Sequence, residues 1–418
     1  MRILILSINY WPEEAGIGAF TTYRAEHLAR AGHEVTVCTS FPYYPEWKVA
    51  AGYRGKWWTS ETRNGVRILR VRAYVPNPVT PLKRIVHEGS YVAGSLMRAM
   101  ATRKPDVILA VSPPLGLAMS ANVLSRLWRR PYVFDVEDLQ PDAAAELGML
   151  PGGALRALYA VERMAYRNAA RVSTLTRGMR NRIVEKGIAA EKVLLFEPRA
   201  DESLFEIATA EGVAFRKKHG LEGRFLVVHS GNIGMKQGLD VMLDAAALSR
   251  EEDVVRYLIV GDGADKRRIE QSAQERSLEN VRFLPLLDAA EFRGLLAASD
   301  VCLVTQRRTV SDIVFPSKAV TYLAAGCAVI ASVNAGSEVA QCIREAGAGT
   351  VVQPEDGNAL HAAIREMQRS GLEECRLAAR AYARSRWSAE RVLGFMEQSL
   401  AAVCETKPAL LAKQEIRP

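Results

Sequence analysis

Short apolar runs alternate with stretches of helical periodicity from one end of the chain to the other. The runs are rich in Val, Ile and Leu, which is typical of strands buried on both faces of a parallel sheet. We expect strands at residues 2–8, 34–39, 66–71, 106–111, 132–136, 171–175 and 193–196, and then at 225–229, 255–260, 281–284, 301–304, 328–333 and 349–352. The alternation of strand and helix predicts an α/β chain with parallel sheets.

The strands fall into two series. The chain has 418 residues, more than one hydrophobic core commonly holds, so two domains are expected. A polar stretch at residues 197–223 separates the series and is interpreted as a linker. We therefore assign residues 1–198 and 199–384 to the two domains, residues 385–406 to a C-terminal helix and residues 407–418 to a loose tail. No repeat typical of solenoids or propellers is visible.

Residues 41–81 are expected to be irregular apart from the strand at 66–71, and they are rich in aromatic side chains. Basic side chains at Arg54, Lys56 and Arg63 lie among these rings. The combination predicts a flap at residues 43–58 that meets a membrane interface or an acceptor; packing of the rings onto the first domain is the alternative. A long helix with further lysines and arginines is predicted at residues 82–103.

The net charge of +8 is unevenly distributed. Residues 1–200 carry 28 Lys and Arg against 17 Asp and Glu, a net charge of +11, whereas residues 201–418 carry −3. A basic first half indicates a polyanionic partner. Because no nucleic-acid motif accompanies the charge, and because apolar and aromatic residues alternate with the basic ones, an anionic membrane surface fits better.

Other features indicate the compartment. No apolar run is long enough to span a membrane, and the first residues form a strand rather than a signal peptide. The six cysteines are scattered without a Cys-x-x-Cys pair, which favours a reducing cytosol and argues against a zinc site. We expect a cytoplasmic protein that associates peripherally with the inner face of the cell membrane.

The stretch from Asp300 to Glu338 is the most informative about chemistry. After the strand at 301–304 comes a polar loop and then a helix that begins near Pro316 and ends at Gly326. Ser317 is a possible N-cap, and Lys318 places a cation beside free backbone N–H groups. This arrangement predicts a site for an anion such as a phosphate; a capped helix with a solvated lysine is the alternative.

Two further places attract attention. Gly16 and Gly18 lie between the first strand and the first helix, where they permit either close backbone approach to a ligand or simply a tight turn. They do not complete a dinucleotide fingerprint, so a nicotinamide cofactor is poorly supported. Glu137 and Asp138 follow the strand at 132–136, at the sheet edge where open parallel sheets bind ligands.

A set of motifs in the second half resembles retaining glycosyltransferase family 4. The motifs are Gly231-x-x-Gly234, Lys236, Gly238-Leu239, Val260-Gly-Asp-Gly263, Asn280-Val-Arg-Phe283, Ala298-Ser-Asp-Val301, Pro316-Ser-Lys318, Tyr322-Leu-Ala-Ala-Gly326, Val329-Ile330 and Glu338, in that order. The first half, with Pro12-Glu13, Gly16-Ile-Gly18 and Pro42-Tyr-Tyr-Pro-Glu-Trp47, is similar to the subgroup of colanic-acid and O-antigen fucosyl- or N-acetylfucosaminyl-type transferases.

This resemblance implies a GT-B fold, in which two Rossmann-like domains with parallel sheets face a cleft and a C-terminal helix crosses back to the first domain. It implies that the first domain binds a saccharide acceptor; with the basic and aromatic first half, we expect a polyprenyl-diphosphate-linked or other saccharide. The second would bind a UDP- or GDP-linked sugar. Such enzymes usually need neither a metal nor a cofactor, and this chain lacks an Asp-x-Asp triplet.

The resemblance also implies roles for residues. Lys236, Lys318 and the N–H groups near Gly234 and Ser317 would stabilise the departing diphosphate. Asp138 would orient the acceptor, although capping of the next helix is the alternative. Glu338 would contact the donor, with a helix-start cap as its alternative. The further donor-binding candidates are Gly16, Gly18, Gly231, Asn232, Gly261, Gly263, Pro316 and Thr321.

The chain departs from the family pattern at two places. Family members often carry two glutamates, with seven residues between them, at the positions of Ile313 and Thr321. They also often carry a histidine at the position of Glu137. Other functions remain open for this reason: a sugar-nucleotide 2-epimerase of the same fold, a donor-binding pseudo-enzyme, or a membrane scaffold.

Overall fold

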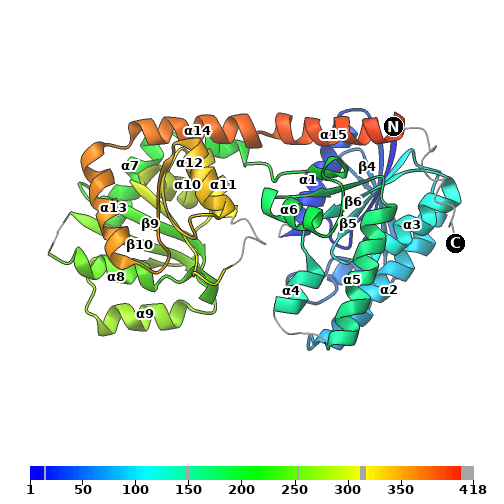
Figure 1. Ribbon diagram of the computed structural model, residues 1–418, viewed down its shortest axis with the longest axis horizontal. Coiled ribbons are helices and arrows are strands. Elements are labelled where there is room, and N and C mark those ends of the chain that lie inside the picture. Colours follow the sequence, from blue (N-terminus) through cyan, green and yellow to red (C-terminus); the bar gives the residue numbers. More distant parts are fainter. Residues whose placement is uncertain (14–15, 147–150, 252–253, 311–316, 406–418) are drawn as a thin grey trace. The chain divides into compact units, whose positions relative to one another are not determined.

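The computed structural model describes residues 1–13, 16–146, 151–251, 254–310 and 317–405. The chain forms two compact units (Figure 1). The first unit contains Met1–Pro198 and the described chain from Leu393 onward, and the second contains Arg199–Val392. The predicted tail at residues 407–418, like Ile313 and Pro316, lies outside the described residues.

The first unit is built on an eight-stranded sheet with the order β3-β4-β2-β1-β5-β6-β7-β8. Its strands are β1 (Arg2–Leu6), β2 (Glu34–Ser40), β3 (Trp58–Arg63), β4 (Val66–Val71), β5 (Val107–Ser112), β6 (Tyr132–Val136), β7 (Arg171–Thr174) and β8 (Val193–Leu195). All neighbouring pairs are parallel except β3 with β4. The central strands are buried throughout, as their continuous apolar sequences predict.

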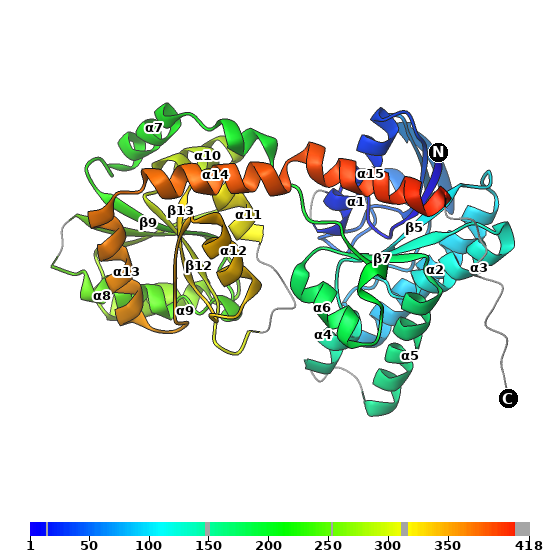
Figure 2. The ribbon, with the colours of Figure 1, turned by 45° about the horizontal axis from the view of Figure 1, so that its top comes forward.

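Helices cover both faces of this sheet. Its helices are α1 (Ile17–Arg30), α2 (Pro81–Met100), α3 (Leu117–Trp128), α4 (Gln140–Glu146), α5 (Gly152–Asn168) and α6 (Arg177–Glu185), with short 3-10 turns η1 (Ala51–Tyr53) and η2 (Ala190–Lys192). Figures 1 and 2 show α2, α3 and α5 together on one face, with α1 and the end of the C-terminal helix on the other. The carboxyl ends of the parallel strands are thereby left for a ligand.

The second unit is built on six parallel strands with the order β11-β10-β9-β12-β13-β14. They are β9 (Phe225–Asn232), β10 (Val255–Asp262), β11 (Val281–Leu284), β12 (Val301–Thr305), β13 (Ala328–Ser332) and β14 (Gly349–Val352). The two expected Rossmann-like sheets are therefore present, and most strand bounds agree with the apolar runs within one to three residues.

Two apolar clusters lie on opposite faces of the second sheet. One contains side chains of α7 (Thr209–His219), α10 (Ala289–Ala298), α11 (Ser317–Ala324), α12 (Glu338–Ala346) and α14 (Glu373–Trp387). The other contains side chains of α8 (Asp240–Leu248), α9 (Lys266–Glu275) and α13 (Gly357–Ser370). The turns η3 (Glu202–Glu206) and η4 (Met235–Gln237) complete the unit. The arrangement of the helices is visible in Figure 2.

Two expectations about local structure were wrong. The predicted linker at residues 197–223 contains α7, which packs so closely on α10 that a Cβ on Gly212 would lie 2.6 Å from the Ala297 carbonyl oxygen. The predicted flap is not wholly irregular, because Trp58–Arg63 forms β3 and pairs with β4. Phe41 and Tyr43 are buried, as packing onto the first domain predicts, whereas Trp57 and Trp58 are exposed.

The C-terminal helix is present as α15 (Ala389–Glu405), separated from α14 by Ser388. Its second half belongs to the first unit, where Glu397 accepts from His33 at 3.0 Å and lies 3.4 Å from His27 of α1. Phe395 meets Phe196 edge to face. Among the described helices, none has the length and apolar character that crossing a bilayer requires.

Candidate functional site

Lys318 is held at the first turn of α11, beside the carboxyl end of β9. Its Nζ lies 2.8 Å from Nε2 of His229 and donates to the Asn232 carbonyl oxygen at 3.2 Å. Gly231 makes this approach possible, since a Cβ there would lie 3.0 Å from Cε of Lys318, and its φ of +107° favours glycine. Lys318 is therefore not the solvated lysine of the alternative interpretation.

Among the described residues, no carboxylate compensates the charge of this ammonium. Burial lowers the pKa of Lys318 to about 8. Burial, together with the neighbouring lysine, also lowers the pKa of His229 well below its usual range, so His229 is neutral and accepts from the ammonium. No described carboxylate forms an ion pair with Lys318. A partly buried cation held by a neutral ring and a carbonyl can attract an anion.

The other glycines of the motif set are explained by backbone packing. β9 and β10 remain paired beyond the core, through Gly231 opposite Gly261. A Cβ on Gly261 would lie 2.0 Å from the Gly231 carbonyl oxygen, and one on Gly263 would lie 2.3 Å from that of Ile233. Both glycines thus allow the two strand ends to approach each other beside Gly231, the glycine that Lys318 contacts.

Two residues that the sequence did not suggest, Gln237 and Arg307, hold the loop after β9. The N–H of Gly234, expected to face a phosphate, donates to Oε1 of Gln237 at 3.1 Å. Lys236 is exposed on η4, and its carbonyl accepts from the N–H of Arg307 at 2.9 Å. The Arg307 side chain donates to the Met235 carbonyl at 2.7 Å. Within the described part of the chain, Lys318 is the one of the two predicted lysines whose side chain is held by hydrogen bonds.

The remaining second-unit candidates lie at helix starts. Ser317 is the first residue of α11 and is exposed, and Thr321 lies one turn later, partly buried. Glu338 is the first residue of α12, but the cap is Ser337, whose hydroxyl accepts from the Ala340 N–H at 3.2 Å. Glu338 therefore does not cap that helix, although its charge suits the helix start.

In the first unit the predicted residues are dispersed. Gly16 precedes α1 with a φ of +56°, and Gly18 lies within that helix, where a Cβ would meet the Glu13 carbonyl oxygen at 2.6 Å. The approach that Gly18 permits is thus to its own chain. Asp138 is partly buried in the loop between β6 and α4.

A buried ionic cluster next to Asp138 was not predicted. Arg24 of α1 donates through Nη1 to Asp135 and to Glu137, each at 2.6 Å, and through Nη2 to the Phe196 carbonyl at 3.0 Å. Burial, followed by the nearby Asp135 charge, raises the pKa of Glu137 to about 8 despite the arginine. Oε2 of Glu137 is buried without a partner among the described residues. The sequence did contain a signal for this cluster: Asp135 and Glu137 flank Val136, the last residue of a buried strand, so a cation was needed near them.

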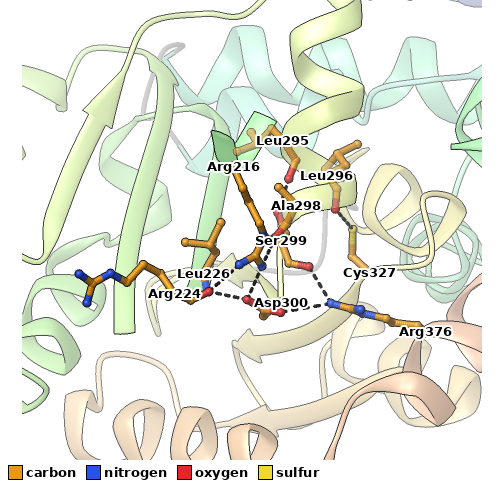
Figure 3. Close-up of polar contacts among 10 residues, drawn as sticks. All are labelled: Arg216, Arg224, Leu226, Leu295, Leu296, Ala298, Ser299, Asp300, Cys327 and Arg376. Atoms are coloured by element: carbon orange, nitrogen blue, oxygen red, sulfur yellow. Dashed lines mark hydrogen bonds and ion pairs between the residues drawn. The ribbon is translucent and has the colours of Figure 1, made fainter. Parts of the chain in front are cut away.

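The motif residue Asp300 serves the fold and not the site. It lies at the amino edge of the second sheet, immediately before β12 (Figure 3). Its carboxylate accepts from Arg216 at 2.7 Å and from the Leu226 N–H at 2.8 Å, and Arg376 approaches at 3.5 Å. The cluster ties α7, β9 and α14 to this edge, which lies at the opposite end of the strands from Lys318.

In the described part of the chain, no group of three or more His, Cys, Asp or Glu side chains is arranged to hold a metal ion. The site at Lys318 is thus composed of a cation, a neutral imidazole, the Asn232 carbonyl and the first turn of a helix. Such a set suits a phosphate group rather than a divalent cation.

Comparison with known families agrees with this reading of both units. Residues 15–198 match the model described as "Glycosyl transferase 4-like domain", and residues 213–386 match "Glycosyl transferases group 1". The chain is 38% identical over 402 residues to the putative colanic acid biosynthesis glycosyl transferase WcaI of Escherichia coli, covering 94% of this chain and 98% of that protein.

Solved structures share the fold at lower sequence identity. The Anabaena protein HepE in complex with UDP superposes with a TM-score of 0.72 at 18% identity, covering 96% of this chain and 100% of that one. WaaG, a glycosyltransferase involved in lipopolysaccharide biosynthesis, superposes with a TM-score of 0.65 at 18% identity, covering 95% and 99%. These likenesses identify the architecture as GT-B.

Proposed function

We propose, for a chain that belongs to glycosyltransferase family 4, the following reaction. The protein moves a sugar from a nucleotide-sugar to a saccharide acceptor during synthesis of a bacterial surface polysaccharide. The observation that carries the proposal is the partly buried ammonium of Lys318, which lacks a described carboxylate partner at the ligand edge of a parallel sheet. The complex of the structural neighbour HepE with UDP supports a nucleotide-linked donor.

The chemistry assigned to this site is stabilisation of the leaving group. When the bond from the anomeric carbon to the diphosphate breaks, negative charge grows on the phosphate oxygens. The Lys318 ammonium would neutralise part of that charge, and the N–H groups at the start of α11 would add donors. Since protein groups supply the positive charge, we propose transfer without a metal or cofactor. We further propose retention of the anomeric configuration.

An acceptor at a membrane is supported by a groove in the first unit. The groove, of about 450 Å³, lies between α2 and the edge of the sheet and is lined by Trp57, Trp58 and Met97 together with Arg72 and Arg98. The two tryptophans are 67% and 66% exposed. Exposed indole rings beside guanidinium groups suit an interface with anionic lipid, where a polyprenyl-diphosphate-linked saccharide would lie.

The donor half of the proposal is tested by calorimetry with UDP-, GDP- and dTDP-sugars, followed by transfer to a lipid-linked acceptor. Wild-type protein is expected to bind one class and to transfer its sugar, whereas a 2-epimerase would convert the donor without an acceptor. Absence of binding to all three classes would overturn the proposal. A donor that binds without conversion in the presence of acceptor would indicate a pseudo-enzyme.

The membrane half needs a separate test. Binding to vesicles containing anionic lipid is expected to weaken with added salt, because the attraction of the basic first half is screened. Trp57→Ala/Trp58→Ala should bind less at every salt concentration and should lower transfer to a lipid-linked acceptor more than it lowers hydrolysis of the donor by water. Equal binding of wild-type protein to neutral and anionic vesicles would contradict the electrostatic part.

A further inference from the structure

The neighbouring strands β9 and β12 stop pairing before β9 reaches its carboxyl end. β12 pairs with β9 through Val227 and Val228, whereas β10 remains paired with β9 as far as Asn232. The strand order runs outward in opposite directions from β9 and β12, so the place where they separate is the switch point at which open parallel sheets bind ligands. Beyond Val228, the buried edge of β9 therefore needs hydrogen-bond partners other than a strand.

Tyr322 of α11 supplies such a partner. Its hydroxyl oxygen accepts from the N–H of Ser230 at 2.9 Å, and it lies 3.0 Å from Oγ and 3.3 Å from the carbonyl oxygen of the same residue. One phenol thus takes the place of a neighbouring strand. Tyr322 is fully buried, and its ring belongs to the apolar cluster that includes side chains of α7, α10 and α12. A phenylalanine there would leave the N–H of Ser230 without this partner.

The same face of α11 carries the cation of the candidate site. Lys318 and Tyr322 are four residues apart on this helix and so lie one above the other. Both side chains reach the end of β9. Lys318 contacts the ring of His229 and the carbonyl oxygen of Asn232. Tyr322 contacts Ser230, which lies between those two residues in the chain. The first half of α11 is thus fastened to one strand end by two side chains.

We propose that Tyr322 is a positioning residue for the diphosphate of the donor, because its hydroxyl fixes α11 against β9 and thereby holds the Lys318 ammonium in the site. Since the tyrosine is fully buried, it acts through Lys318 and not by contact with the donor. The inference rests on the proposed role of Lys318 in glycosyl transfer. The surroundings of the ammonium can nevertheless be measured without any donor.

Loss of the hydroxyl has two linked consequences. The N–H of Ser230, left unpaired, favours entry of water between α11 and β9. Lys318 is then better solvated, so its pKa should rise from about 8 toward the ordinary value of a lysine. The ammonium is also held less firmly at the place where an anion would meet it, so affinity for a diphosphate should fall.

The titration of Lys318 reports its own surroundings. The titratable groups facing the two side chains are His229 of β9, Cys302 of β12 and Cys327, which precedes β13. Burial, and then the neighbouring ammonium, lower the pKa of His229 well below its ordinary range. Burial raises the pKa of Cys302 well above its ordinary range. The ring that contacts the ammonium therefore stays neutral while Lys318 is titrated.

The test combines competitive acetylation of the full chain with calorimetry. Trace acetic anhydride labels an amine only in its unprotonated form, so the pH of half-maximal labelling at Lys318 gives its titration without a ligand. We expect that pH to be about 8 in wild-type protein and to rise by about 0.5–1 unit in Tyr322→Phe. At pH 7, affinity for UDP or GDP, used as probes, should fall about three- to tenfold in the same variant.

Tyr257→Phe is the matched control. Tyr257 is also a fully buried tyrosine of the second unit, and its hydroxyl lies 2.8 Å from Oγ of Ser249. Its ring belongs to the apolar cluster on the other face of the sheet. Removing this hydroxyl should lower the unfolding temperature, but it should change neither the labelling of Lys318 nor the affinity for the probes.

The outcomes separate this role from the proposed function. An unchanged labelling pH in Tyr322→Phe would overturn it, and so would a loss of affinity without a change in labelling or equal changes in Tyr257→Phe. If Tyr322→Phe does not fold, Ser230→Ala, which removes the hydroxyl at 3.0 Å, should raise the labelling pH by a smaller amount, and no rise would overturn the role. Wild-type protein that binds neither probe would count against glycosyl transfer, while the labelling would still support or overturn the role of Tyr322.

Discussion

The two units each bury a cation near the carboxyl ends of their strands, but they treat its charge in opposite ways. In the first unit Arg24 meets the carboxylate of Asp135, the carboxyl group of Glu137 and a backbone carbonyl, so a counter-ion accompanies its charge. In the second unit Lys318 meets a neutral histidine and a carbonyl, so its positive charge has no described counter-ion. The same sheet architecture thus holds one cation that is paired with a carboxylate and one cation without a described carboxylate partner.

The difference separates a group that holds the fold from one that is available to a ligand. A buried charge that has its counter-ion gains nothing from a bound anion, whereas a partly buried charge without one does. The lowered pKa of Lys318 expresses the cost of this arrangement. Removing each cation should therefore have opposite consequences for stability and for binding.

The largest effect is expected for Arg24→Met. Loss of the guanidinium leaves Asp135 and Glu137 buried without it, and the free energy of unfolding of the first unit should fall by about 3–5 kcal/mol. Calorimetric unfolding should show the loss in one transition. Adding Asp135→Asn and Glu137→Gln should recover part of it. A triple variant no more stable than Arg24→Met would show that the arginine acts by packing alone.

Lys318→Met should have the reverse pattern. Donor affinity is expected to fall about 10- to 100-fold, because a charge-assisted hydrogen bond contributes about 1.5–3 kcal/mol. The unfolding temperature should be unchanged or raised, since a poorly compensated charge is removed. Titration calorimetry and thermal unfolding of the same preparation measure both. Lys236→Met is the control, and an equal loss of affinity there would remove the distinction between the lysines.

The pH dependence of donor binding should follow the pKa of Lys318. Since that pKa is about 8, the ammonium form dominates below pH 8 and affinity should decrease as the pH rises above it, by at most about tenfold per unit. His229→Leu removes an acceptor of the ammonium and should shift the decrease to lower pH. A pH profile that is flat between 7 and 9.5 would exclude Lys318 from the donor site.

For Glu137→Gln we expect a change in the slope of stability against pH. Because the pKa of Glu137 is about 8 in the folded state against an ordinary value of 4.5, the folded protein keeps a proton that the unfolded chain releases. This contribution to stability is complete below pH 4.5 and is lost as the pH rises toward 8, by at most about 1.4 kcal/mol per unit. Unfolding curves of Glu137→Gln should show a shallower decline; parallel curves would contradict the shifted pKa.

The sequence predicted the parts of the fold that depend on local pattern. Continuous apolar runs identified the buried strands, for example 281–284 and 349–352, whose bounds agree with β11 and β14. β3 was missed because its residues are exposed or partly exposed and include Glu61 and Arg63, so no apolar run marks this edge strand. α7 was missed because its last turn is basic and its packing depends on Gly212 and Phe215.

The candidate site was predicted less completely, because its contacts join distant segments. Lys318 was identified from a helix start, but its partner His229 lies 89 residues away. A histidine inside the apolar strand at 225–229 was the signal that something polar must meet it. Arg24 lies 111 residues from Asp135, and no local pattern connects them. Asp300 belonged to a recognised motif, yet the motif gave no indication that it fastens the amino edge.

The assignment of the end of α15 to the first unit has a consequence for biosynthesis. Residues 1–198 leave the ribosome as one segment, but the helix that contacts His27 and His33 is made only after the whole second unit. At a translation rate of about 5–20 residues per second, that interval lasts about 10–40 s. During this interval the surface of α1 that later contacts α15 is uncovered. It is therefore a surface at which other nascent chains or chaperones can bind.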